Sequence, residues 1–153
     1  MGRILEFITV NVATRDPDSA VAKWWAIGLP SLPAVHLPDP PAEITDITLQ
    51  IGTAAAVSVI APTGPGSPVQ RFLDRRGEGA YSIAVRVDSL ADVMREWAAA
   101  GIEWALTAPY EFPPGSAAGR YVPERLKANW VKPSSLNGVM LEVFEFVGVV
   151  EHR

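Results

Sequence analysis

The chain has 153 residues, 48% of them hydrophobic, and its 13 basic and 17 acidic residues give a net charge of −4. This balance argues against nucleic acid as the main partner, and the absence of cysteine excludes disulfides, thiolate catalysis and cysteine-ligated metals. No apolar run reaches the roughly 18 residues of a membrane helix and no signal-peptide layout is present, so we expect a cytoplasmic protein with no membrane partner.

The first segment with a clear pattern is FITVNVATRDPDSAVAKWWAIGLP. Residues 7–14 have the composition of a β-strand. Asp16 followed by Pro17 indicates a helix start, and Gly28 is favoured just after a helix end, so we predict a helix over 17–27. Further strand-like runs follow at residues 44–51 and 56–60.

The second patterned segment, AYSIAVRVDSLADVMREWAAAGIEW, repeats the first. We predict a strand over 81–87, a helix capped by Asp88 and a helix end at Gly101. The two capping aspartates are 72 positions apart and the two glycines 73. Strand-like runs follow again, at residue 121, 128–132 and 139–146.

The repeat predicts one α+β domain over residues 1–153, in which tandem βαβββ modules form a curled mixed sheet around a cavity. The first module covers residues 1–62, a linker with a short helix covers 63–78, and the second module covers 79–147. Two irregular stretches rich in proline or glycine, residues 29–43 and 108–129, are candidate lids over that cavity.

Three features carry a family resemblance: the tandem βαβββ pattern and the segments VSVIAPTGPGSPVQRFLDRRGEGAYSIAVRVDSLADV and WVKPSSLNGVMLEVFEF. In these features the chain resembles the vicinal oxygen chelate superfamily. This superfamily includes glyoxalases, bleomycin-resistance proteins and extradiol dioxygenases, and the methylmalonyl-CoA epimerase branch is the most similar. The resemblance implies a divalent metal held by four strand residues, usually two His, a Glu or Gln, and a Glu. The metal would polarise a carbonyl or enolate oxygen.

Carried over by position, these four family ligands fall on Thr9, Ser58, Ser82 and Glu142. Only Glu142 matches the family pattern. Neutral hydroxyls are poor ligands for a transition metal, so we expect no metal and no other cofactor. The four residues are then candidates for a polar ligand site, in which Glu142 takes a proton; the alternative is a structural network that satisfies Glu142.

Further candidates come from the epimerase branch and from charge. Asp46 falls near the branch's general base, although its register is open and a solvent-facing strand residue is the alternative. Arg120 and Arg125 are candidates for a substrate carboxylate or phosphate, and Tyr81 and Trp130 are candidates to line the cavity.

Three readings of function remain open for this sequence. The first is an isomerase, epimerase or lyase that acts without metal on a small carbonyl or acyl-CoA-type compound. The second is a non-catalytic binding protein of the bleomycin-resistance type, and the third is a metal-dependent epimerase or glyoxalase with unusual ligands. We expect a small-molecule ligand and a homodimer.

Overall fold

The computed structural model describes residues 1–53 and 55–153, and the chain divides into two compact units. Unit 1 comprises residues 1–8 and 82–153, and unit 2 comprises residues 9–81. Strands β1 (Ile4–Ala13) and β5 (Gly79–Val87) each begin in one unit and end in the other. Each unit therefore contains the first residues of a strand that continues in the other unit.

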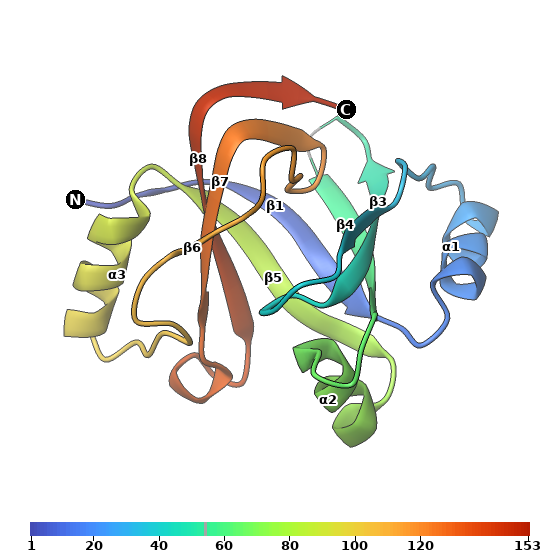
Figure 1. Ribbon diagram of the computed structural model, residues 1–153, viewed down its shortest axis with the longest axis horizontal. Helices are drawn as coiled ribbons and strands as arrows, with labels where there is room; N and C mark the ends of the chain where they lie inside the picture. Colours follow the sequence, from blue (N-terminus) through green and yellow to red (C-terminus); the bar gives the residue numbers. More distant parts are fainter. Residues whose placement is uncertain (54) are drawn as a thin grey trace. The chain divides into compact units, whose positions relative to one another are not determined.

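Besides β1, the elements of unit 2 are α1 (Pro17–Ala26), β2 (Val35–Leu37), β3 (Ile44–Ile51), β4 (Ala55–Pro62) and α2 (Pro68–Arg76). Its strands are ordered β2-β3-β4-β1 in the sheet. β1 pairs with β4 in parallel, and the other neighbours are antiparallel. Helix α1 packs against β3 and β4 (Figure 1), where Val21 meets Leu49 and Val59 in a buried apolar cluster.

Besides β5, the elements of unit 1 are α3 (Leu90–Ala99), β6 (Tyr110–Glu111), β7 (Tyr121–Val131), the 3₁₀-helix η1 (Pro133–Ser135) and β8 (Met140–His152). This unit repeats the topology of unit 2, with its strands in the order β5-β8-β7-β6. β5 pairs with β8 in parallel, and β7 is antiparallel to both β8 and β6. Helix α3 packs against β7 and β8 (Figure 1). The predicted fold class, α+β with tandem modules and a mixed sheet, is confirmed.

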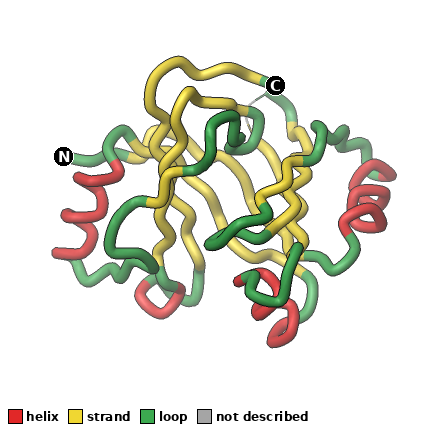
Figure 2. The backbone as a smooth tube through the Cα atoms, in the orientation of Figure 1, coloured by secondary structure: helices red, strands yellow, loops and turns green. Residues whose placement is uncertain are grey.

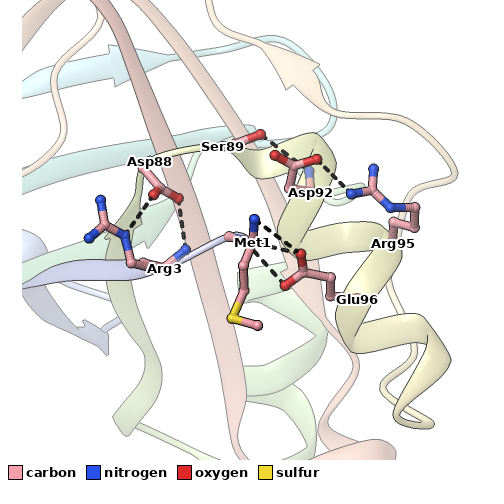
Figure 3. A network of polar contacts seen from close by, with 8 residues as sticks. Met1, Arg3, Asp88, Ser89, Asp92, Arg95 and Glu96 are labelled. Carbon is pink, nitrogen blue, oxygen red and sulfur yellow. Dashed lines mark hydrogen bonds and ion pairs between the residues drawn. The ribbon is translucent and has the colours of Figure 1, made fainter.

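The helix boundaries agree with the sequence except at one cap. Asp16 accepts a hydrogen bond from the Ser19 backbone N–H at 3.1 Å, as predicted. Helix α3 is capped by Ser89, which accepts from the Asp92 N–H at 3.3 Å, so the assignment of the cap to Asp88 was wrong. Asp88 instead accepts from the backbone N–H of Arg3 at 2.7 Å and binds its guanidinium (Figure 3).

The irregular stretches contain more strand than the sequence indicates. Residues 29–43 include β2, and the predicted fragments at 121 and 128–132 are one strand, β7 (Figure 2). Proline and glycine flank these strands, which weakens their sequence signal. Within the described part of the chain, every helix is too short or too polar to cross a membrane.

Candidate functional site

The sheet of unit 1 has one face packed on α3 and one face turned away from it. Val85, Val131 and Val143 lie in the apolar cluster with Leu90 and Val93 of α3. Because neighbouring residues on a strand point to opposite faces, Glu142 points away from that cluster. We call this second surface the Glu142 face; it is formed by Ser82, Arg86, Trp130, Glu142 and Phe144.

The strand register gives Glu142 its neighbours. It lies opposite Ala84 of β5 on one side and opposite Trp130 of β7 on the other. Directly opposite residues share a face and lie close together. Ser82, two positions before Ala84, is 5% exposed and belongs to the same face. The carboxylate therefore sits between a small residue and an aromatic ring, outside the helix-packed core.

A row of aromatic rings runs across the Glu142 face. Phe112 contacts Trp130 and Phe144 with ring centroids 6.4 and 6.2 Å apart. Phe144 contacts Phe146 at 6.4 Å, and Phe146 contacts Tyr121 at 5.4 Å. Such rings supply the large apolar surface of a small-molecule site.

A second charged group on this face was missed by sequence reasoning. Arg86 Nη1 donates to Glu6 Oε1 at 3.2 Å, and the Tyr121 hydroxyl donates to Glu6 Oε2 at 2.9 Å. Burial and then the hydrogen bond to Glu6 raise the pKa of Tyr121 above 10.0, so the phenol stays protonated at neutral pH. The available signal was the alternation that places Arg86 on the same face as Ser82.

In unit 2, three hydroxyl groups lie close together on neighbouring strands β1, β3 and β4. Thr9 Oγ1 donates to Ser58 Oγ at 3.3 Å, and Thr48 Oγ1 lies 3.4 Å from Ser58 Oγ. All three are buried, with 3%, 0% and 0% exposure for Thr9, Ser58 and Thr48. Asp46 lies on the same strand face, two residues before Thr48. We call the surface formed by Thr9, Asp46, Thr48 and Ser58 the hydroxyl face.

The two faces carry equivalent residue pairs. In unit 2, Thr9 lies opposite Ala56, and Ser58 comes two residues after Ala56 on β4. In unit 1, Ser82 lies opposite Met140, and Glu142 comes two residues after Met140 on β8. The pairing register therefore relates Thr9 to Ser82 and Ser58 to Glu142.

The chemistry of these donors does not fit the divalent metal that the resemblance implies. Only Glu142 is charged, and the single proton of the Thr9 hydroxyl is already shared between Ser58 Oγ and the Val10 carbonyl, at 3.3 and 3.1 Å. Within residues 1–53 and 55–153, no group of three His, Asp or Glu side chains is arranged to hold a metal ion. We therefore assign no metal-dependent step to these residues.

The remaining predicted residues lie in other surroundings. Tyr81 packs edge-on against Phe72 of α2, with centroids 5.1 Å apart. Arg125 is about half exposed and makes a two-pronged ion pair with Glu111, at 2.7 and 3.0 Å. Arg120 is half-buried, and its carbonyl accepts from the Arg153 N–H at 2.9 Å. Trp130 alone of the aromatic and basic candidates lies directly beside Glu142.

Comparison with known proteins identifies a family whose model matches the chain and solved structures that share its fold. The family model described as "Glyoxalase/Bleomycin resistance protein/Dioxygenase superfamily" matches residues 10–122. No match to a curated protein reaches significance.

Solved structures of the same fold include two epimerases. Methylmalonyl-CoA epimerase from Mycobacterium tuberculosis is 24% identical with a TM-score of 0.77, over 95% of this chain and 90% of that one. A Streptomyces coelicolor methylmalonyl-CoA epimerase variant in complex with 2-nitronate-propionyl-CoA is 18% identical with a TM-score of 0.78, over 95% and 100%. A hypothetical protein from Bacillus halodurans C-125 is 21% identical with a TM-score of 0.78, over 99% of both chains.

Proposed function

Because the chain belongs to the glyoxalase/bleomycin resistance protein/dioxygenase superfamily, we propose that it transfers a proton at a carbon next to a carbonyl, without a divalent metal. The proposed substrates are small carbonyl compounds or acyl-CoA thioesters. The fold shared with methylmalonyl-CoA epimerases supports this class. The observation that carries the proposal is the position of Glu142, a carboxylate beside Trp130 on the face turned away from α3.

The chemistry requires a base and a group that stabilises the enolate. In the proposed step, the Glu142 carboxylate takes the proton and the C–H electron pair delocalises onto the carbonyl oxygen as an enolate. Hydroxyl donors stabilise such an oxygen, more weakly than a metal does, and we assign this role to Ser82, which lies on the Glu142 face. Return of a proton from Glu142 to another carbon of the enolate completes an isomerisation, and delivery of a solvent proton to the opposite face completes an epimerisation.

The direct test is exchange of the α-proton in D₂O. Methylmalonyl-CoA and propionyl-CoA are incubated with chelator-treated protein, and loss of the α-proton signal is followed by NMR. We expect exchange by the native protein and a decrease of about 10²- to 10⁴-fold in Glu142→Gln. Glu103→Gln is the matched control, because Glu103 is exposed and pairs with Lys132 at the surface. Exchange that appears only after Mn²⁺ or Co²⁺ is added would overturn the metal-independent mechanism.

A binding protein is the second candidate, and the aromatic row favours it. Rings from Phe112, Trp130, Phe144, Phe146 and Tyr121 suit a flat organic ligand. Calorimetric titration with bleomycin tests this reading. Stoichiometric binding without proton exchange in either CoA ester would favour sequestration over catalysis.

A further inference from the structure

Arg86 stands on the Glu142 face, close to the proposed base. It lies opposite Phe144 in the strand register, two pairs beyond Ala84 and Glu142. Two residues along a strand correspond to about 6.6 Å. A small ligand in contact with Glu142 is therefore within reach of the Arg86 guanidinium.

The guanidinium is held in place but is only partly used. Its central carbon lies 4.6 Å from the centroid of the Phe146 ring, and Nη1 binds Glu6. Arg86 Nε is buried and has no hydrogen-bond partner within the described residues. A buried donor of a charged group without an acceptor is costly, and in native proteins it calls for an explanation.

Another arginine of this chain shows what such an edge binds. Arg125 uses Nε and Nη2 together to hold the two carboxylate oxygens of Glu111, at 2.7 and 3.0 Å. This two-pronged geometry is the preferred way for a guanidinium to bind a carboxylate. In Arg86, Glu6 binds at Nη1 and so leaves the corresponding edge to another group.

We propose that the Nε and Nη2 edge of Arg86 binds a carboxylate group of the ligand, so that the protein selects small carboxylates whose second functional group reaches Glu142. Tyr121 and Glu6 act as positioning residues, because they hold Nη1 and leave the other edge in place. The proposal deepens the proposed function and rests on it for the role of Glu142. Binding of the carboxylate itself needs no turnover.

The test is therefore a binding measurement that is independent of catalysis. The full chain is titrated with malonate and succinate, with the neutral diamides malonamide and succinamide, and with inorganic phosphate. The Nε–H signal of Arg86 and the indole signal of Trp130 are followed by NMR. We expect saturable shifts of both signals with the dicarboxylates only. Equal shifts with the diamides, or saturation by phosphate alone, would overturn the carboxylate assignment.

Variants separate a binding role from a structural one. Arg86→Gln should weaken dicarboxylate binding by about 10- to 100-fold, and Arg86→Lys should not restore it because lysine lacks the planar fork. Glu6→Gln should bind dicarboxylates more tightly, because it removes a competing negative charge while its amide oxygen can still accept from Arg86 Nη1 and keep the guanidinium in position. Arg95→Gln is the control, since Arg95 lies exposed on α3 and pairs with Asp92.

These outcomes also distinguish the inference from the proposed function. Dicarboxylate binding that depends on Arg86, without α-proton exchange, would leave this inference standing and remove the catalytic proposal. Exchange of the α-proton by the native protein, together with an unchanged kcat/KM in Arg86→Gln, would support the catalytic proposal and overturn this inference. A purely structural Glu6–Arg86 pair predicts that Glu6→Gln lowers stability and leaves dicarboxylate affinity unchanged, which would overturn the inference.

Discussion

Glu78 accepts a hydrogen bond from Thr14 Oγ1 at 2.8 Å, and a second one from the Arg15 backbone N–H, also at 2.8 Å. The residues 72 positions from Glu78 and Thr14 are Glu6 and Arg86, which form the ion pair of unit 1. The repeat therefore conserves one geometric contact and changes its chemistry. A hydroxyl meets the carboxylate in unit 2, and a guanidinium meets it on the face that carries Glu142.

The Glu78 contact predicts a pH-dependent contribution to stability. The Arg15 N–H and then the Thr14 hydroxyl hold the pKa of Glu78 below its ordinary value of 4.5. A group with a lowered native pKa stabilises the fold above the unfolded value, and this contribution is lost as pH falls through the native value. Urea unfolding should show Glu78→Gln less stable than the native chain at neutral pH, with the difference shrinking below pH 4.5. A difference that stays constant over this range would contradict the assignment.

Gly2 predicts a steric limit at the start of the chain. Its backbone nitrogen donates to the Glu96 carboxylate and lies 3.2 Å from both oxygens, and a Cβ at this position would lie 2.9 Å from the Val93 backbone nitrogen. Because backbone cannot move aside cheaply, Gly2→Ala should lower the free energy of unfolding by about 1–3 kcal/mol.

The matched control for Gly2 is the same substitution elsewhere. In Gly64→Ala the new Cβ would meet only the end of the Glu43 side chain, at 3.2 Å. That side chain is flexible, so the change should stay within about 0.5 kcal/mol. Equal losses of stability in the two variants, measured by urea unfolding, would refute the steric argument.

The cap of α3 gives a third prediction. Ser89 accepts from the Asp92 N–H at the helix start, so Ser89→Ala should cost about 1 kcal/mol of unfolding free energy. Asp88 holds Arg3 of β1 instead. Asp88→Ala should therefore raise hydrogen exchange at the Arg3 amide without a comparable change at Asp92. The opposite pattern of exchange would restore Asp88 as the cap.

A fourth prediction concerns Asn129, which is fully buried on β7. Its side chain accepts from the Leu106 N–H at 3.1 Å and donates to the Leu106 carbonyl at 2.9 Å. Asn129→Leu leaves both backbone groups without their partner, so it should cost about 1–3 kcal/mol of stability in thermal or urea unfolding. Gln70→Leu, which removes an exposed amide contact with Asp74 on α2, is the comparison; an equal loss there would show that the Leu106 contacts contribute nothing specific.

The fold was predictable because the two modules share one strong pattern. Periodic apolar positions and the Asp-Pro start of α1 set the helices, and the 72-residue repeat set the topology. Boundaries failed where local signals compete. Asp88 and Ser89 are both good caps, and only the approach of Arg3, 85 positions away, decides between them.

The site was predictable only in part, because strand alternation gives faces but not partners. Alternation along a strand over residues 140–146 is enough to put Glu142 on the same face as Met140 and Phe144, and the register of β8 agrees with it. It gave no reason to connect Arg86 with Glu6, which is 80 positions away. The ion pair of Arg125 with Glu111 depends likewise on β6, a two-residue strand with almost no sequence signal.

The hydroxyl face yields the last prediction, which separates a ligand site from a structural network. Both hydrogen bonds at Ser58 are long, at 3.3 and 3.4 Å, and Thr9 keeps its bond to the Val10 carbonyl without them. Ser58→Ala should therefore cost less than about 1 kcal/mol of stability. If Ser58 binds a ligand oxygen, the same variant should weaken the binding of methylmalonyl-CoA, measured by calorimetric titration, by about 10-fold. Ser135→Ala, at a surface hydroxyl that accepts from the Glu103 N–H, should leave this binding unchanged. A large loss of stability in Ser58→Ala with unchanged binding would make the three hydroxyls a structural network, since a ligand-binding hydroxyl affects affinity more than folding.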